Sequence, residues 1–128
     1  METCFLWGLS GRVVLPWDPS YNKDRQGFNR AAQSYPFIIN YCQTPRDVSN
    51  AILWARRNGV EIRIRNGGHN YEGYSSGNGV LVIDVSDMTG IEMDEQAHTV
   101  RVQGGVTNKQ LYEFVAAQGY PFPGGTCP

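Results

Sequence analysis

The sequence lacks any marked excess of charge of one sign. Its 128 residues include 11 lysines and arginines against 12 aspartates and glutamates, which gives a formal net charge of −1. Proteins that bind nucleic acid usually carry a clustered positive excess, because contacts to phosphates dominate their affinity. We therefore expect no nucleic-acid partner. The length fits one domain or a part of a larger protein.

Cysteine is scarce, and its spacing suggests no framework. Cys4, Cys42 and Cys127 are an odd number of cysteines, and no two of them have a spacing typical of a zinc site. This argues against a disulfide framework and against a structural metal, so we predict no metal-binding residue. It leaves room for one reactive thiol.

Long hydrophobic runs are absent as well. The opening residues include a short apolar run, but it contains Glu2, has no basic segment before it, and is too brief for a signal peptide or a membrane span. We expect no membrane association and a cytoplasmic protein.

A well-marked helix is predicted at residues 44–59. Thr44 can serve as the N-cap, a proline occupies the first helical position, and Gly59 follows the last turn as a stop. An aspartate in the first turn and two arginines in the last turn suit the helix dipole. The apolar stripe expected to face the core is Val48, Ala51, Ile52 and Ala55.

Three predicted strands flank this helix. An apolar run at residues 37–41 precedes it, an alternating segment at residues 60–65 follows it, and a second apolar run lies at residues 80–85. The run at 80–85 suits a strand covered on both faces. Because the helix provides a crossover, parallel pairing is favoured for the first two strands. In the alternating segment, the buried face is expected to carry Val60, Ile62 and Ile64.

The pattern changes in the last third of the chain. Residues 91–102 are typical of two short strands around a polar turn, an antiparallel hairpin whose unpaired edge favours self-association. Residues 107–119 predict a helix that begins with a capping box of Thr107 and Gln110. Its inward-facing residues are expected to be Leu111, Phe114 and Val115.

Together these elements predict an α+β fold. Residues 37–128 would form a small parallel βαβ sheet followed by an antiparallel hairpin and a helix. Residues 1–36 are rich in proline, asparagine, aspartate and aromatics with weak periodicity, so we expect an irregular, partly helical lead-in.

Several aromatic residues and His98 are assigned no chemistry. Basic residues do not alternate with the aromatics, so we expect hydrophobic packing rather than a stacking surface for nucleic acid. His98 falls in the turn of the predicted hairpin and is expected at the surface. The aromatics concerned are Trp7, Trp17, Tyr35, Tyr41 and Trp54.

The segment RNGGHNYEGYSSGNG, residues 65–79, holds more glycine and more polar and aromatic side chains than a connector needs. Gly67 and Gly68 directly follow a predicted strand, where N–H groups with no Cβ beside them can converge on a phosphate or diphosphate. The standard patterns G-x-G-x-x-G before a helix and G-x-x-x-x-G-K-[ST] are missing. A dinucleotide bound here would therefore be bound by a different fold.

Two soft nucleophiles accompany two glycine pairs. His69 follows the first pair, and Cys127 lies in a second Gly-Gly segment. A neutral imidazole and a thiol can both act as nucleophiles, which suggests two attachments to one ligand. The alternatives are a solvated turn histidine and a small, half-buried thiol. Glu72 either contacts a cofactor or caps the loop, and we assign it neither role.

The segment RNGGHNYEG resembles the R-x-G-G-H-x-x-x-G signature of the FAD-linked oxidases related to berberine bridge enzyme. The flavin domain of that family is of the p-cresol methylhydroxylase (PCMH) type. GGTCP resembles the start of the family's second cofactor segment. GRVVLPWDPSYN, INYCQTPRDVSNAILWARRNG, VIDVSDMTGIEMD and VRVQGGVTNKQLYEFV also resemble the family in the same order, so the likeness covers nearly the whole chain.

This resemblance implies a tightly held FAD. His69 would bond to the ring-methyl carbon of the flavin, and Cys127 to the adjacent ring carbon. Two such bonds would raise the reduction potential and suit the oxidation of small-molecule substrates, namely sugar-like or secondary-metabolite alcohols. The diphosphate would be held mainly by backbone N–H groups, and the implied cofactor-binding residues around it are Arg65, Asn66, Gly67, Gly68 and Asn70, with Ser75 nearby and Gly125 and Thr126 on the other side.

The resemblance also implies that much of the enzyme lies outside this sequence. Family members continue through the rest of the flavin domain and a substrate domain, and the catalytic base usually comes from those parts. We therefore predict an N-terminal fragment that is inactive alone and carries no catalytic residue. Two other hypotheses stay open: a flavin-binding module or half of a split enzyme that needs a partner chain, and a small structural domain whose glycine loops are only turns.

Overall fold

The computed structural model describes residues 5–70 and 72–125. The chain forms two compact units, Met1–Asp87 and Met88–Pro128. Their helices and strands confirm the predicted α+β class. No helix among the described residues is long and apolar enough to cross a membrane.

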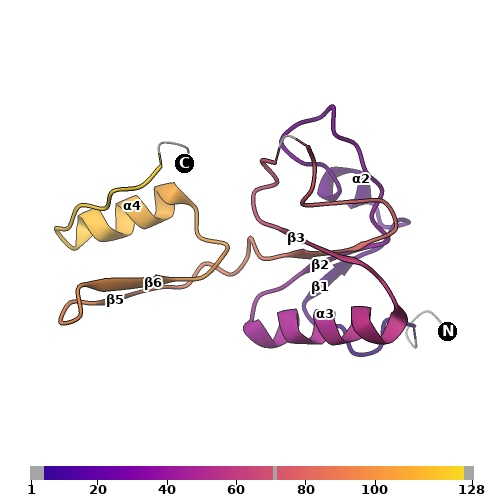
Figure 1. Cartoon of the computed structure of the whole chain (residues 1–128), viewed down its shortest axis with the longest axis horizontal. Coiled ribbons are helices and arrows are strands. Elements are labelled where there is room, and N and C mark those ends of the chain that lie inside the picture. The colour runs from indigo at the N-terminus through magenta and orange to yellow at the C-terminus, as the bar shows by residue number, and fades with distance from the viewer. Residues whose placement is uncertain (1–4, 71, 126–128) are drawn as a thin grey trace. The chain divides into compact units, whose positions relative to one another are not determined.

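The first unit is built on a four-stranded sheet (Figure 1). Its elements are β1 (Arg12–Val14), α2 (Tyr21–Asp24), β2 (Ile38–Tyr41), α3 (Pro45–Asn58), β3 (Ile62–Arg65) and β4 (Leu81–Asp84). The strand order is β1-β2-β4-β3, in which β1 is antiparallel to β2 while β2 and β3 both run parallel to β4. The two strands joined by α3 are thus parallel, as expected, but they pair with β4 between them rather than with each other. The sequence pattern did not predict β1.

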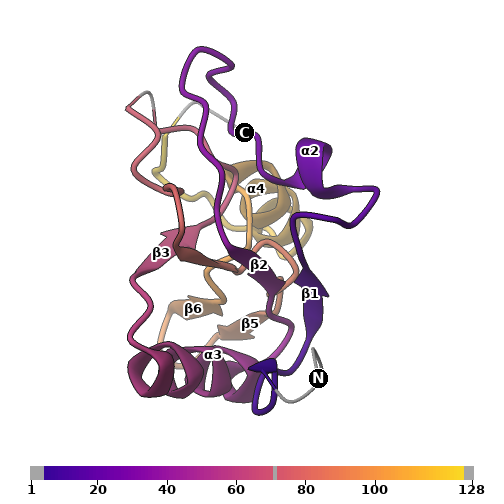
Figure 2. The same cartoon turned by 90° about the vertical axis from the view of Figure 1, so that its right-hand side faces the viewer.

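The helix α3 forms as its sequence predicts. The Thr44 hydroxyl accepts a hydrogen bond from the Asp47 N–H, the Asp47 carboxylate accepts one from the Thr44 N–H, and Gly59 ends the helix at φ 65°. The helix lies along one side of the sheet, with α2 and the loop between β3 and β4 on the other side (Figures 1 and 2). Its buried residues are Ala51, Trp54 and Ala55, whereas Ile52 is exposed, so the predicted burial of Ile52 is wrong.

Burial along β3 differs from the prediction. Ile64 is 53% exposed, whereas Arg65 is only 6% exposed. Because β3 is the edge strand of the sheet, no further strand lies beyond it, and the face that carries Ile64 is left partly uncovered. The side that carries Arg65 meets α2 and the end of β4, where its charge finds partners. The predicted burial of Ile64 is therefore wrong.

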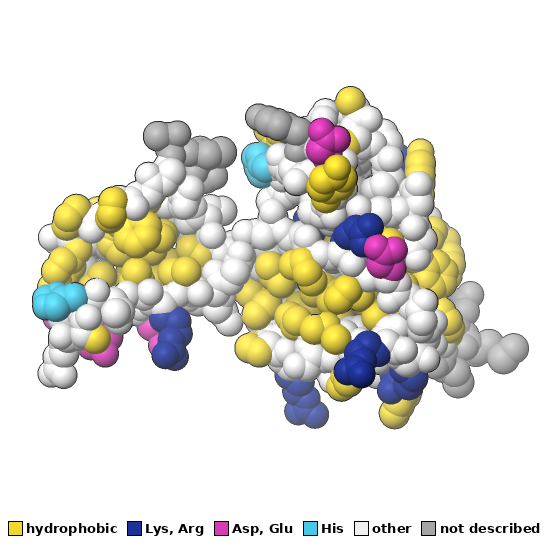
Figure 3. All heavy atoms as spheres, in the orientation of Figure 1, with side chains coloured by type: hydrophobic (Ala, Val, Ile, Leu, Met, Phe, Trp, Pro, Cys, Tyr) yellow, Lys and Arg dark blue, Asp and Glu magenta, His cyan; other side chains and the backbone are white. Residues whose placement is uncertain are grey.

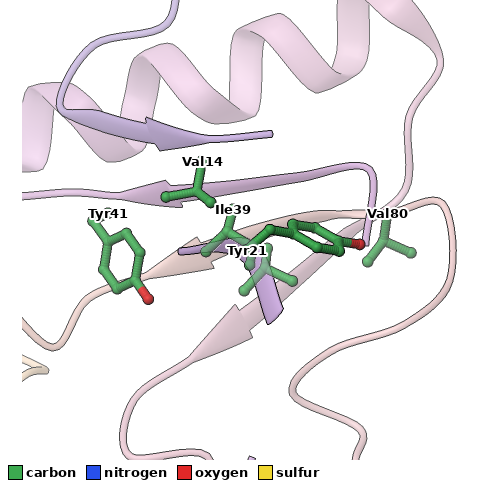
Figure 4. Close-up of a cluster of buried hydrophobic side chains, with 6 residues drawn as sticks. Val14, Tyr21, Ile39, Tyr41 and Val80 are labelled. Atoms are coloured by element: carbon green, nitrogen blue, oxygen red, sulfur yellow. The ribbon is translucent and has the colours of Figure 1, made fainter. Parts of the chain in front are cut away.

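A hydrophobic cluster attaches the lead-in segment to the sheet. It consists of Val14, Tyr21, Ile39, Tyr41, Val80 and Val82 (Figure 4). Tyr21 comes from α2, and its hydroxyl donates a 2.7 Å hydrogen bond to the Pro36 carbonyl. Full burial of one large apolar side chain is worth about 1.5–3 kcal/mol. The chain around α2 is therefore held beside the loop that follows β3.

The aromatic residues divide into two groups. Trp54 and Tyr41 are buried, as expected, but Trp7, Trp17 and Tyr35 are exposed, and the prediction of packing is wrong for them. Arginine side chains lie over two of the exposed rings instead: Arg57 is 5.2 Å from the ring centroid of Trp7, and Arg25 is 4.3 Å from that of Tyr35. Attraction between a guanidinium and an aromatic face can hold a ring at the surface.

The second unit is a hairpin and a helix. β5 (Ile91–Asp94) pairs antiparallel with β6 (Thr99–Val102), and α4 (Asn108–Ala117) begins with the predicted capping box. Leu111 and Val115 are buried and Phe114 is half-buried. His98 is exposed in the turn, as expected. The unit contains an apolar recess of about 350 Å³, whose lining includes Met93, Val100, Val115, Tyr120 and Phe122.

Hydrophobic side chains also reach the surface of both units (Figure 3). The first unit exposes Ile52, Leu53 and Ile64, and the second exposes Val102, Tyr120 and Phe122. Exposed apolar patches commonly mark surfaces that other protein covers.

Candidate functional site

The glycine-rich loop leaves the sheet where three parallel strands end together. Tyr41, Asp84 and Arg65 are the last residues of β2, β4 and β3, and they lie in one row because Tyr41 pairs with Asp84 and Asp84 pairs with Arg65. Ligands of open parallel sheets commonly bind outside this carboxyl edge. The loop of residues 66–79 thus begins at the edge where a ligand is expected.

Arg65 fixes the start of the loop with its side chain. Its Nε donates to Asp84 Oδ2 at 2.6 Å, Nη1 donates to the Asp24 carbonyl at 2.6 Å, and Nη2 donates to the Tyr41 hydroxyl at 3.1 Å. The Asp84 carboxylate also accepts hydrogen bonds from the N–H and hydroxyl of Ser86. The guanidinium therefore ties β3 to β4, β2 and the end of α2, and it is directed into the protein.

Tyr41 completes this network as both donor and acceptor. Its hydroxyl donates to Asp24 Oδ1 at 3.0 Å while it accepts from Arg65. Burial raises the pKa of Tyr41 above its ordinary value of 10.0, although the charge of Arg65 acts in the opposite direction. The hydroxyl thus stays protonated at neutral pH and can keep both bonds.

Two consecutive glycines form the turn at the start of the loop. Gly67 and Gly68 have φ values of 66° and 69°, in the left-handed region that favours glycine. The Gly68 N–H donates to the Asn66 carbonyl at 2.6 Å, which closes a three-residue turn. The Gly68 carbonyl accepts from the Phe28 N–H at 2.8 Å, and a Cβ on Gly68 would lie 3.3 Å from Gly27 Cα. Two segments of backbone therefore meet here with no room for a side chain.

His69 directly follows this turn. The side chain is exposed, and its ring stacks on that of Phe28 with centroids 4.5 Å apart and planes inclined by 20°. The next residue, Asn70, shapes the loop: its Oδ1 accepts from the backbone N–H groups of Glu72 at 2.9 Å and Tyr74 at 3.2 Å. The exposed imidazole lies beside a main-chain turn, which is an arrangement that a ligand can approach.

The structure brings four of the predicted cofactor-binding residues together. Arg65, Gly68, Asn70 and Ser75 line one small recess together with residues of the lead-in, including Arg25. The recess has a volume of about 10 Å³. This is roughly the room that one water molecule needs, so a diphosphate cannot lie inside it. The surface available to a larger ligand is the outer side of the loop.

The second glycine segment belongs to the other unit. Gly125 is exposed, and its carbonyl accepts a hydrogen bond from the Tyr112 hydroxyl of α4. Thr126 and Cys127, also predicted to contact the cofactor, lie outside the described residues. Among the residues that the structure does describe, no group of three or more histidine, cysteine, aspartate or glutamate side chains could hold a metal ion.

Sequence reasoning missed three residues of this site. Tyr41 and Asp84 had a detectable signal, because each is a polar residue at the end of an apolar run. Phe28 had none, since it lies in an irregular segment far from the loop in the sequence. Its contact with His69 depends on how the lead-in folds over the strand ends.

Comparison with known proteins assigns the family. Residues 36–128 match the model of a family described as FAD binding domain. The chain belongs to the FAD binding domain family. It is 39% identical over 118 residues to the uncharacterized FAD-linked oxidoreductase YgaK of Bacillus subtilis, with 92% of this chain and 26% of that protein covered. It is 35% identical over 130 residues to Berberine bridge enzyme-like 18 of Arabidopsis thaliana, with 94% and 24% covered.

A solved structure agrees with this assignment. BBE-like 1 of Physcomitrella patens superimposes with a TM-score of 0.89 at 30% identity, over 98% of this chain and 28% of that one. The resemblance to FAD-linked oxidases related to berberine bridge enzyme is thus confirmed, and so is the corresponding fold. This member of the FAD binding domain family spans about a quarter of the length of the relatives it matches.

Proposed function

We propose that this chain binds FAD on the outer side of the glycine-rich loop, as part of an oxidoreductase that acts on sugar-like or secondary-metabolite alcohols. The observation that carries the proposal is the Gly67–Gly68 turn at the carboxyl edge of the parallel strands, where Gly67 is exposed and the exposed imidazole of His69 lies beside it. Family membership makes FAD the ligand to test. When bound, FAD would accept a hydride or electrons from the substrate.

The residues of the loop fit the diphosphate of FAD in two ways. Gly67 is exposed and has no Cβ, so a ligand can approach its main chain closely. Arg25 lines the recess behind the turn and contributes positive charge near an anion. In this proposal the main chain of Arg65 through Asn70 contacts the diphosphate with Ser75 nearby, and Gly125 and Thr126 contact its other side.

The second part of the proposal is covalent attachment through His69 and, as a second bond, through Cys127. An imidazole nitrogen of His69 would hold the flavin through a bond to its ring-methyl carbon, and the Cys127 thiol would hold it through a second bond to the adjacent ring carbon. Each bond would replace one hydrogen of the protein group and one of the flavin, a two-electron oxidation for which dioxygen would be the oxidant and hydrogen peroxide the product. His69 suits this role because its ring is exposed beside the turn.

We further propose that residues 37–128 form an incomplete FAD-binding domain and that this chain alone has no turnover. The chain spans about a quarter of its relatives, and the proposed substrate domain and catalytic base belong to the remainder. Its exposed apolar side chains give a specific reason for a second candidate, a flavin-binding module completed by a separate partner chain (Figure 3). Both candidates give the same FAD contacts and differ in which polypeptide covers those surfaces.

Expression of residues 1–128 with FAD tests the proposal. We expect saturable, weak quenching of FAD fluorescence and no flavin in the acid-precipitated protein. The reading frame extended past Pro128 should instead yield flavin that survives acid precipitation, and His69→Ala with Cys127→Ala should abolish it. If residues 1–128 show no saturable binding, the proposed loop site is wrong. If the extended protein binds FAD but never retains it in acid, only the attachment is wrong.

A further inference from the structure

A short stretch of the lead-in, Gly27–Phe28, is part of the site. Its backbone holds the turn, because the Phe28 N–H donates to the Gly68 carbonyl at 2.8 Å and Gly27 lies against Gly68. The Phe28 side chain contacts His69, the proposed nucleophile, because its ring stacks on the imidazole. This stretch precedes residues 36–128, the part of the chain that the family model matches.

The imidazole of His69 is confined on two sides. Phe28 covers one face of the ring at a centroid distance of 4.5 Å. Gly67 lies at the edge, where an added Cβ would be 3.0 Å from His69 Cδ2. The Phe28 ring is itself 63% exposed, so its contact with His69 is not a by-product of burial in the hydrophobic core.

We propose that Phe28 is a positioning residue that orients the His69 imidazole for its bond to the flavin. This inference rests on the FAD attachment proposed above and adds no bond to it. A nucleophile held in one orientation spends more time aligned with the carbon that it attacks, and removal of its support slows the reaction without removing the nucleophile. A tyrosine at this position keeps an aromatic face and should keep the function, whereas an alanine should not.

The ring contact is testable in residues 1–128 without any flavin. Ring currents of Phe28 should displace the imidazole proton resonances of His69, and the chain has only one other histidine, His98, as an internal reference. We expect Phe28→Ala to move the His69 resonances and leave those of His98 unchanged, and Phe28→Tyr to restore them. The alanine variant keeps the main-chain bond to Gly68. Unchanged His69 resonances in Phe28→Ala would overturn the inference.

The consequence for attachment is measured in the extended protein as the rate at which acid-stable flavin forms after FAD is added. An aromatic pair is typically worth enough to change a rate by roughly 2- to 10-fold, so we expect Phe28→Ala to slow attachment by about that factor and Phe28→Tyr to restore it. Reversible FAD affinity should change by less. Equal attachment rates in Phe28→Ala and the unsubstituted protein would overturn this inference alone. No acid-stable flavin in the unsubstituted protein would overturn the proposed attachment and this inference with it.

Discussion

The buried ion pair between Arg65 and Asp84 gives a quantitative prediction about how the loop is anchored. The side chains are 7% and 5% exposed, and Nε lies 2.6 Å from Oδ2. Asp84→Ala would leave a buried guanidinium without its carboxylate, which typically costs about 3–5 kcal/mol. A unit the size of Met1–Asp87 has a total stability of roughly 4–13 kcal/mol. The single substitution should therefore remove much of the stability of the first unit.

The double variant Arg65→Met, Asp84→Leu separates the charge effect from packing. With both charges gone, the main losses are the hydrogen bonds that Arg65 donates to Asp24 and Tyr41 and those that Asp84 accepts from Ser86, worth about 1 kcal/mol each. Replacement of a buried pair by apolar residues is often neutral or stabilising, so we expect the double variant to be clearly more stable than Asp84→Ala.

Urea unfolding followed by tryptophan fluorescence, in which the buried Trp54 reports the loss of packing, measures both variants. If the double variant is as unstable as Asp84→Ala, an unpaired buried charge is not the cause, and the reasoning is refuted. The double variant should also bind FAD more weakly, because the end of β3 from which the loop leaves is no longer tied to β2 and α2.

Three further predictions concern single positions. Gly68→Ala should cost about 1–2 kcal/mol of backbone strain and also weaken FAD binding. Gly79 has φ 68° and nothing within 4 Å of an added Cβ, so Gly79→Ala should show the strain alone. Equal losses of affinity in FAD titrations of the two variants would contradict this. Burial and, to a lesser extent, nearby carboxylates raise the pKa of Cys42 from 9.0 to about 11, so stability present below pH 9.0 should decline as the pH rises towards 11. Iodoacetamide should label Cys42 only when the protein unfolds. Rapid labelling of the native protein in peptide maps would refute this prediction. Hydrogen bonds, the one from Ser10 foremost, lower the pKa of Asp47 below 3.8, so the stability that its carboxylate adds above pH 3.8 is lost as the pH falls through the folded pKa. Asp47→Asn should flatten this part of the plot of unfolding free energy against pH. An unchanged plot would count against the capping role.

The parts of the fold that local chemistry determines could be predicted from the sequence. The helix α3 has a capping threonine, a proline at its first position and a left-handed glycine at its end, and the structure has all three. The capping box of α4 and the hairpin of β5 and β6 were equally local. Each of these signals lies within a few residues of the feature that it predicts.

The features that the sequence did not reveal depend on contacts between distant segments. The position of β4 between β2 and β3 follows from pairing across the whole unit. The alternating pattern of β3 alone suggested that the Arg65 side chain is solvated. Its burial depends on a carboxylate of another strand and an acceptor at the end of α2. Phe28 reaches His69 only because Tyr21 and its neighbours hold the lead-in against the sheet.

In the proposed site, the main chain of the glycine-rich loop contacts the diphosphate of FAD. An amide ¹H–¹⁵N NMR titration of residues 1–128 with FAD measures this contact, with adenosine as a ligand that lacks the diphosphate. We expect FAD, and not adenosine, to shift the amide resonances of residues 66–70 in a saturable manner. Saturable shifts confined to other residues, with those of the loop unmoved, would contradict it.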